Sequence, residues 1–376
     1  MNLDNTPYLG VKKKVYSQVQ AMRELGHQVD VAYCNESGLV IQVGNVKNII
    51  ELKRGITKYR YSIYKIVAPK IIRDGYQMVY IRFPGSIDIA MYLMIKALKT
   101  QGIITYLEVP TYPIVGEMTK RLKDSFLKRK FKDFVTCSVA YSIHIIARKM
   151  CAKFLDKIIT FSPVESIWGA PTITIENGVN ISEYEILPKK EFSAEEVVLI
   201  GVANLSIWHG YDRVIKGIAE YYKYKTINEP DVEFIIVGNG EAKEDLEKLS
   251  MQLNIKEKVK FTGNLQGNEL KEVYKKSHIA MASLGMHRLG LKIASTLKTK
   301  EYCAQAFPFV YGYEEVALNK KIQFAFQIES NEAPLNIRDV NAFWARIQNI
   351  PDYQSEMYQF AKENYDWIIQ MKKIFE

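Results

Sequence analysis

Apolar runs and helical patterns alternate along the whole chain, and they predict strands that alternate with helices. In the first half, the pattern predicts strands over residues 28–34, 76–83, 103–109, 155–161 and 171–175 and helices over 11–25 and 86–100. In the second half, it predicts strands over 197–202, 232–237, 259–262 and 278–283 and helices over 210–222, 241–253 and 267–276. This alternation indicates an α/β protein with parallel, doubly wound sheets, which bind ligands at the carboxyl ends of their strands.

The beginning of the chain departs from this pattern. A helix over 11–25 followed by a strand over 28–34 is the second half of a strand–helix–strand unit, but the polar segment ahead of Gly10 has no strand pattern. We therefore expect that the first strand is absent from this polypeptide or that the chain starts downstream of its natural beginning. Residues 39–75 have a mixed hairpin or short-helix pattern that predicts no single element.

The length of 376 residues favours two domains. The acidic segment over residues 181–196 contains Pro188 and lacks periodicity, so it is the predicted linker. We expect one Rossmann-like domain over 1–185 and a second over 196–350. A C-terminal helix over 351–376 is expected to pack back on the N-terminal domain.

Charge separates the two halves. Residues 1–150 hold 24 Lys and Arg against 11 Asp and Glu, whereas residues 151–376 hold 27 against 31. The basic half suits a surface that meets anionic lipid or an anionic substrate. It would also suit nucleic acid, but no nucleic-acid-binding module is recognisable. Four scattered cysteines form no metal motif and indicate buried thiols in a reducing cytoplasm, and neither a membrane span nor a signal peptide is visible.

Seven basic residues occur between Lys120 and Lys132, with phenylalanines interleaved as far as Phe134. As a helix, this run would be a basic amphipathic surface of the kind that lies on anionic membranes. It would equally be the solvated face of an ordinary long helix.

The stretch over residues 282–308 carries the clearest chemical signal. An apolar strand leads into a loop with Gly285 and Gly290, and a helix follows with Ser295 as the predicted N-cap. Backbone N–H groups and the helix dipole favour an anion at such a site, and Arg288 and Lys292 add charge. A glutamate further along the helix could hold hydroxyl groups beside a phosphate, which suggests a nucleotide or a nucleotide sugar. The alternative is a loop with ordinary surface charges.

Several segments together resemble a known family: GVKKKVYSQVQAMRELGHQVDV, YLEVPTYP, the NGVN turn, LIGVANLSIWHGYDRVI, FIIVGNGE, VKFTGNL and the 282–308 stretch. The chain resembles bacterial retaining glycosyltransferases of the GT-B architecture and of the glycosyl transferase group 1 type. The resemblance implies two facing Rossmann-like domains, a nucleotide-sugar donor held mainly by the C-terminal domain and an acceptor on the N-terminal domain. It also implies that no metal or other cofactor is needed.

The resemblance transfers to individual residues only in part. Glu301 matches the second of two family glutamates, which holds the donor ribose, but Ile293 stands where the first is expected. Asn204 and His209 occupy the places of an arginine and a lysine that neutralise the diphosphate in relatives. The expected donor contacts are Gly10, Asn204, His209, Gly238, His287, Arg288, Gly290, Leu291, Lys292, Thr296 and Glu301. The catalytic candidates are Glu108, Arg288 and Lys292, whereas His27 and His144 are interpreted as structural.

The resulting expectation is the transfer of a hexose, with retention, from a UDP- or GDP-linked sugar to a cell-surface polysaccharide or a lipid-linked glycan precursor. The protein would be cytoplasmic and could lie on the inner face of the cell membrane. The alternative is a catalytically weak or inactive pseudo-transferase that acts as a partner subunit, which Ile293 and Asn204 motivate. No nucleic-acid partner is expected.

Overall fold

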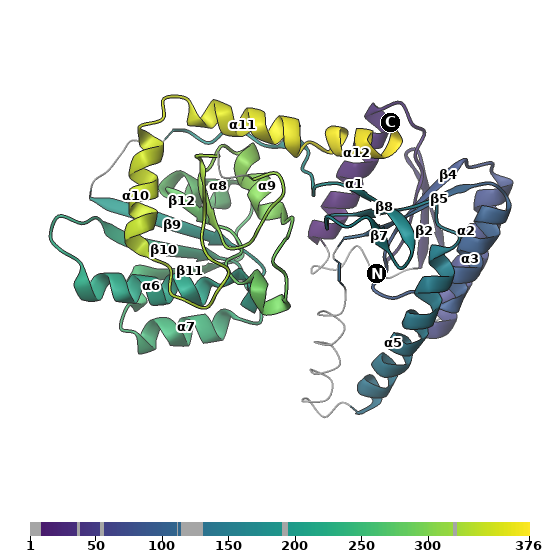
Figure 1. Cartoon of the computed structure of the whole chain (residues 1–376), viewed down its shortest axis with the longest axis horizontal. Helices are drawn as coiled ribbons and strands as arrows, with labels where there is room; N and C mark the ends of the chain where they lie inside the picture. Colours follow the sequence, from purple (N-terminus) through teal and green to yellow (C-terminus); the bar gives the residue numbers. More distant parts are fainter. Residues whose placement is uncertain are drawn as a thin grey trace. The chain divides into compact units, whose positions relative to one another are not determined.

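The computed structural model describes residues 9–35, 38–52, 56–110, 112–113, 131–189, 195–318 and 322–376. The chain divides into two compact units (Figure 1). The N-unit comprises Met1–Glu176 and Trp367–Glu376, and the C-unit comprises Asn177–Asp366. The chain thus passes from one unit to the other after Glu176, ahead of the acidic segment over 181–196, and it returns only at Trp367.

The N-unit is built on a five-stranded sheet in the order β4-β5-β6-β8-β7. Its strands are β4 (Met78–Arg82), β5 (Ile104–Val109), β6 (Lys157–Thr160), β7 (Ser166–Ile167) and β8 (Ala170–Thr174). All neighbours are parallel except β7 and β8. Four of the five strands were predicted from their apolar runs, and only the two-residue strand β7 was missed.

Helices cover both faces of this sheet because its strands are apolar on both sides. Ile158 of β6 packs with the core under α2 (Ile56–Arg73), α3 (Ile89–Thr100) and α5 (Phe131–Ala152). The next residue, Ile159, points to the opposite face, as alternation along a strand requires, and packs with α1 (Leu9–Glu24) and α12 (Trp367–Phe375). Figure 1 shows these two helices side by side, across the sheet from the other three.

The strand predicted over residues 28–34 does not join this sheet. It is β1 (Val31–Cys34), which pairs antiparallel with β2 (Leu39–Val43), and β2 pairs with β3 (Val46–Ile50). The prediction that this strand completes a parallel strand–helix–strand unit is therefore wrong. The reason is that the hairpin over 39–50, to which the sequence assigned no element, supplies hydrogen-bonding partners directly after β1. In the described part of the N-unit, β4 is one edge of the main sheet and β7 is the other.

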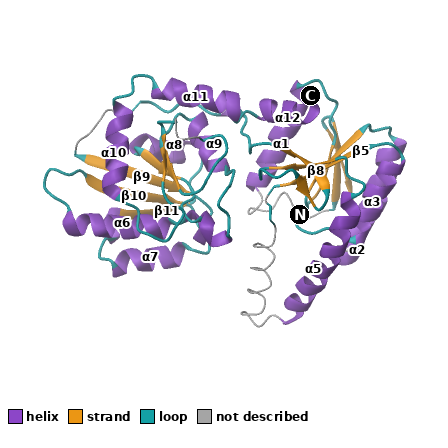
Figure 2. Cartoon of the chain, viewed as in Figure 1, coloured by secondary structure: helices purple, strands orange, loops and turns teal. Residues whose placement is uncertain are grey.

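The C-unit has a fully parallel six-stranded sheet in the order β11-β10-β9-β12-β13-β14. Its strands are β9 (Glu196–Val202), β10 (Asp231–Val237), β11 (Val259–Gly263), β12 (Ile279–Met281), β13 (Phe309–Tyr311) and β14 (Ala325–Gln327). Its helices are α6 (Tyr211–Tyr224), α7 (Lys243–Gln252), α8 (Gly267–Lys276), α9 (Leu297–Ala304), α10 (Ile337–Gln348) and α11 (Tyr353–Asn364). Figure 2 shows these strands enclosed by helices.

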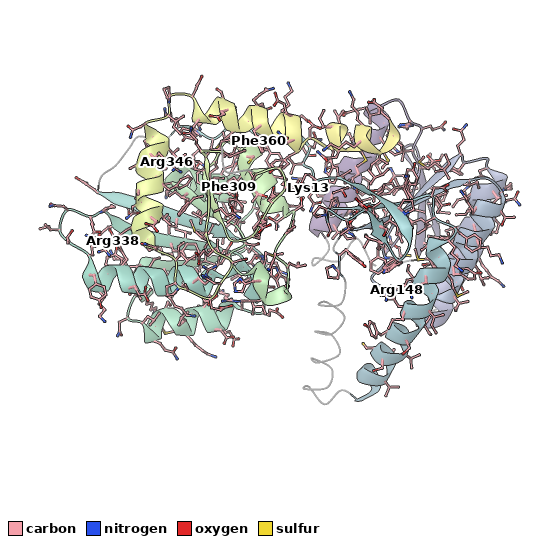
Figure 3. All side chains as sticks on the ribbon, viewed as in Figure 1. Lys13, Arg148, Phe309, Arg338, Arg346 and Phe360 are labelled. Atoms are coloured by element: carbon pink, nitrogen blue, oxygen red, sulfur yellow. The ribbon has the colours of Figure 1, made fainter. Side chains whose placement is uncertain are left out.

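Aromatic side chains fill much of the C-unit core. Phe309 of β13 and Trp344 of α10 are essentially fully buried, and Phe360 of α11 packs against Phe324 and Tyr365 (Figure 3). Helix α11 thus belongs to the C-unit, and of the predicted C-terminal segment over 351–376 only the part from Trp367 onwards belongs to the N-unit. The doubly wound α/β class predicted from the sequence is confirmed in both units.

Candidate functional site

The sheet of the C-unit reverses its direction of growth between β9 and β12. From β9 the chain adds β10 and then β11 on one side, and it then crosses back to place β12, β13 and β14 on the other. In doubly wound sheets such a reversal leaves a crevice at the carboxyl ends of the two strands, where ligands bind. Two loops, over residues 203–210 and 282–296, leave the sheet at this point, and they contain most of the predicted donor contacts.

His209 lies in the first of these loops and is buried. The backbone N–H of Ser206 donates to its Nδ1 at 3.1 Å, so the ring proton is on Nε2. Burial, together with the nearby charge of Lys298, lowers the pKa of His209 to about 3. His209 is thus a neutral N–H donor at physiological pH, and Asn204 in the same loop is exposed.

Two glycines have a packing role at this end of the sheet. Gly238 follows β10 with φ 126°, and a Cβ there would lie 1.8 Å from the carbonyl oxygen of Ala203. A Cβ on Gly285 would lie 3.0 Å from the carbonyl oxygen of Ile207. Both glycines therefore let the second loop and the end of β10 approach the first loop closely.

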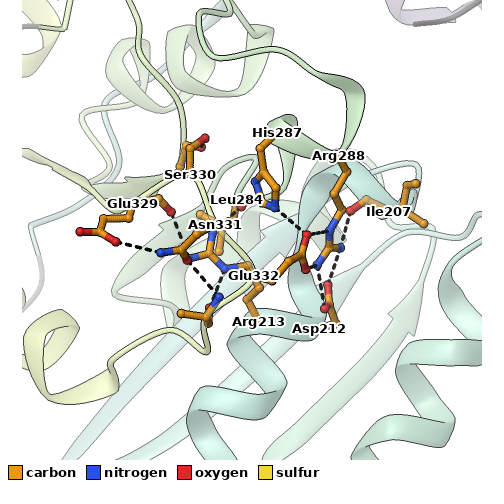
Figure 4. Close-up of polar contacts among 12 residues, drawn as sticks. Ile207, Asp212, Arg213, Leu284, His287, Arg288, Glu329, Ser330, Asn331 and Glu332 are labelled. Atoms are coloured by element: carbon orange, nitrogen blue, oxygen red, sulfur yellow. Dashed lines mark hydrogen bonds and ion pairs between the residues drawn. The ribbon is translucent and has the colours of Figure 1, made fainter.

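Arg288 holds the second loop to its surroundings through ion pairs (Figure 4). Its guanidinium donates to both carboxylate oxygens of Asp212, at 2.8 and 2.9 Å, and its Nε donates to Glu332 at 2.9 Å. His287 contacts the same glutamate through Nε2 at 2.6 Å. Hydrogen bonds to Glu332 and Asp212 raise the pKa of Arg288 further. Hydrogen bonds from Arg288 and His287 lower the pKa of Glu332 to about 2. The Arg288 side chain is therefore engaged by two carboxylates.

The remaining predicted residues of this loop lie beyond Arg288. Gly290 ends the short helical turn over Met286–Leu289, and Leu291 packs against the core. Lys292 is exposed, and its ammonium has no partner among the described residues. Ile293, at the place of the missing glutamate, is 38% exposed and forms a backbone bridge with Glu314.

Helix α9 begins one residue later than predicted. Its N-cap is Thr296, which shares a hydrogen bond of 2.7 Å with the Tyr313 hydroxyl. Ser295 was wrongly predicted as the N-cap. Its Oγ accepts from the backbone N–H of Asn177 at 3.0 Å, so it ties the loop to the start of the C-unit.

Lys298 is a candidate site residue that the sequence analysis missed. It lies in the first turn of α9, and its Nζ donates to the carbonyl oxygen of Val202, the last residue of β9. Burial lowers the pKa of Lys298 to about 8, while the charge of Glu301 opposes this shift. Glu301, which accepts from the Tyr184 hydroxyl at 3.1 Å, is three residues further along the same helix. The sequence signal that could have found Lys298 is its spacing from Glu301, since residues three apart on a helix lie on the same face.

The predicted catalytic candidate Glu108 lies in the N-unit and is fully buried. Its Oε1 accepts from Lys14 at 3.1 Å and from Arg82 at 2.5 Å, and its Oε2 accepts from Gln18 and Tyr80, both at 2.7 Å. Burial would raise the pKa of Glu108, but these charges and hydrogen bonds outweigh it and lower the pKa to about 2. A carboxylate with every lone-pair direction used is a poor proton acceptor.

The remaining sequence predictions concern other parts of the chain. Gly10 lies in the first turn of α1. The basic run from Lys120 to Phe134 lies outside the residues whose side chains are described. Within the described ranges, no group of three His, Cys, Asp or Glu side chains could hold a metal ion, and no helix is both long and apolar enough to cross a membrane.

Comparison with known proteins finds one family that resembles part of the chain. The model described as glycosyl transferases group 1 matches residues 183–295, which include both loops at the β9–β12 crevice. This segment of the chain is similar to that family. An uncharacterised glycosyltransferase of Methanocaldococcus jannaschii is 26% identical over 129 residues, and the match covers 31% of this chain and 32% of that protein. The chain therefore spans about a third of the length of this curated relative.

Solved structures show the same fold over most of the chain. A glycosyltransferase from Rickettsia africae ESF-5 superposes with a TM-score of 0.57 at 14% identity, covering 87% of this chain and 83% of that chain. Sucrose-phosphate synthase from Thermosynechococcus elongatus superposes with a TM-score of 0.58 at 14% identity, covering 96% of this chain and 91% of that chain. Anabaena HepE in complex with UDP-glucose superposes with a TM-score of 0.54 at 15% identity, covering 83% of this chain and 81% of that chain. At these identities the likeness concerns the fold alone, and it confirms the GT-B architecture.

Proposed function

We propose that the chain transfers a hexose from a UDP- or GDP-linked sugar to a cell-surface polysaccharide or a lipid-linked glycan precursor, with retention at the anomeric carbon. The observation that carries the proposal is the pairing of Lys298 and Glu301 at the β9–β12 crevice. The Lys298 ammonium, anchored on the last carbonyl of β9, supplies positive charge for a diphosphate. The carboxylate of Glu301, one turn further along α9, supplies acceptors for ribose hydroxyls.

This arrangement compensates for the two basic family residues that the chain lacks. Exposed Asn204 and neutral His209 bring no charge to the first loop. Lys298 from the opposite side of the crevice, with exposed Lys292, supplies it instead. A cation at this place stabilises the diphosphate as it departs and gains negative charge in the transition state.

The proposed reaction breaks the bond between the anomeric carbon and the β-phosphate oxygen and forms a bond from that carbon to an acceptor oxygen. Attack from the face of departure would retain the configuration, and the acceptor proton would pass to the leaving phosphate oxygen. No protein nucleophile is required by this scheme. That suits the absence of a glutamate at Ile293 and the fully paired state of Glu108.

The proposed location of the acceptor rests on the charge of the chain. The basic half of the chain and the run from Lys120 to Phe134 support reversible docking on the anionic inner face of a cell membrane, where a lipid-linked acceptor would be found. Co-sedimentation with phosphatidylglycerol vesicles tests this part. A variant with Lys128, Arg129, Lys130 and Lys132 changed to Gln should stay in solution, and equal pelleting of both proteins would contradict docking.

Turnover tests the catalytic proposal. The purified protein is incubated with a panel of UDP- and GDP-linked hexoses and a lipid-linked or oligosaccharide acceptor, and release of the nucleoside diphosphate is followed. We expect release with one nucleotide and retention in the product. No transfer and no donor hydrolysis with any sugar would contradict the proposal.

The second candidate function is a pseudo-transferase that binds a nucleotide and acts as a partner subunit. Two observations favour it: Ile293 replaces a family glutamate, and the Arg288 guanidinium is held by Asp212 and Glu332. Saturable binding of a nucleoside diphosphate without turnover of any donor would support this candidate.

A further inference from the structure

The charge cluster around Glu108 in the N-unit contains one cation more than neutrality requires. Lys14 and Arg82 both contact the same carboxylate oxygen, and either alone would neutralise it. Among the described residues, no second carboxylate contacts either cation. The rest of the Lys14 ammonium faces aromatic rings, at 3.8 Å from the Phe161 centroid and 5.5 Å from that of Trp367. A buried excess charge of this kind is unfavourable unless an anion pairs with it or a proton is lost.

Arg82 is the member of this cluster that solvent can reach. Its side chain is 23% exposed, whereas those of Lys14 and Glu108 are 4% and 0% exposed. In the described part of the chain, only its Nη1 makes a hydrogen bond, and that bond fixes the guanidinium on Glu108. The Nε and Nη2 donors thus remain for a ligand, in the planar geometry that matches phosphate and carboxylate groups.

The position of Arg82 in the fold also favours a ligand. It is the last residue of β4, and Glu108 lies beside it near the end of β5, so the cluster is at the carboxyl edge of a parallel sheet. This edge is where doubly wound sheets bind ligands. Lys13, the residue before Lys14 on α1, is exposed (Figure 3).

We infer that Arg82, backed by the buried charge of Lys14, binds one anionic group of the acceptor, a phosphate or a carboxylate. Glu108 and Tyr80 act as positioning residues that hold the guanidinium and the ammonium in place. The inference rests on the proposed function, because it names the class of acceptor that the N-unit would take.

Protonation gives the inference a second signature. Burial lowers the pKa of Lys14 to about 7 against the attraction of Glu108, with Arg82 lowering it further. The other groups that face Lys14, the rings of Phe161 and Trp367, do not titrate. An anion should therefore bind more tightly below pH 7, where Lys14 is charged, and more weakly as pH rises through 7 to 8.

The test is calorimetric titration of the full chain, without nucleotide, with glucose 6-phosphate, glucuronate and neutral glucose. We expect saturable binding of one anion or both and none of glucose. The change Arg82→Gln should weaken binding by about 10- to 100-fold, the size of a lost charge-assisted hydrogen bond. The matched control is Arg73→Gln, at an exposed arginine that ends α2, and it should bind as wild type does.

Further arms keep the test decisive. Binding of the phosphate alone or of glucuronate alone identifies the anion, and either supports the site. If Arg82→Gln fails to fold, as judged by circular dichroism, Lys14→Met keeps the arginine and should weaken binding of whichever anion binds the wild type. If that anion is glucuronate, the variant should also lose the dependence of binding on pH between 6 and 8. Absence of saturable anion binding, or equal binding by the Arg82 and Arg73 variants, would overturn the inference. The titration contains no sugar donor, so its result does not depend on whether the protein transfers a sugar. A failure of the anion site and a failure of the proposed function are therefore distinguishable.

Discussion

Replacing Lys298 by methionine should weaken donor binding without lowering the stability of the fold. The change removes the ammonium that donates to the Val202 carbonyl at the β9–β12 crevice and keeps most of the side-chain volume. A charge-assisted hydrogen bond contributes about 1.5–3 kcal/mol, so we expect the Kd for a nucleoside diphosphate to rise by about 10- to 100-fold. The nucleoside without phosphates should bind the variant and the wild type almost equally.

The lowered pKa of Lys298 gives two further expectations, one for thermal stability and one for the pH dependence of binding. Its value of about 8 in the folded chain lies below the ordinary 10.5, so burying the ammonium opposes folding at every pH below 8. Lys298→Met should therefore melt at the same temperature as the wild type at pH 7, or higher. Wild-type affinity for the diphosphate should fall as pH rises from 7.5 to 9.5 and approach that of the variant, whose affinity should not change.

The assay is calorimetric titration with UDP and GDP, beside thermal melting, with Lys276→Met at an exposed position of α8 as the control. The control should retain wild-type affinity at each pH. An unchanged Kd in Lys298→Met, or equal losses for the diphosphate and the nucleoside, would refute the role of this ammonium as the phosphate contact.

Four other changes have specific expected outcomes. Glu301→Gln should abolish the preference for ribo- over deoxyribonucleotides, measured as the ratio of their Kd values; no such preference in the wild type would contradict the ribose role. Arg288→Ala should lower the free energy of unfolding by about 1–3 kcal/mol in urea, because two carboxylates lose their partner, and change nucleotide affinity less than threefold. Glu108→Gln should lower stability by about 3–5 kcal/mol at pH 6 and by less at pH 9, where Lys14 is neutral in the fold. Gly238→Ala, whose Cβ would meet a backbone carbonyl at 1.8 Å, should cost about 2–4 kcal/mol in the same urea assay.

Regular alternation of apolar and polar residues was sufficient to predict most elements of both sheets. The helix predicted over 267–276 coincides with α8 (Gly267–Lys276), and the strand over 197–202 is β9 to within one residue. In these segments the local sequence pattern and the burial of the apolar side chains favour the same element. Residues 39–75 were not predictable, because their hairpin pairs with β1 and their helix α2 contains Pro69, which weakens any helical pattern.

The location of the candidate site could be predicted from the sequence, but the contacts that its side chains make could not. Glycines, basic residues and a helix start indicated the stretch over 282–308, and that stretch does border the crevice. Sequence could not show that Arg288 would meet Asp212 and Glu332, which lie 76 and 44 residues away along the chain. Lys298 was overlooked for the same reason, since its significance comes from the end of β9, 96 residues earlier.

The most direct test of the central claim is a crystal structure of the protein with a bound nucleoside diphosphate. The account predicts the β-phosphate within about 2.7–3.2 Å of the Lys298 Nζ and the ribose hydroxyls on the Glu301 carboxylate. A nucleotide bound away from the carboxyl ends of β9 and β12, or one whose phosphates contact neither Lys298 nor the loop over 282–296, would contradict it.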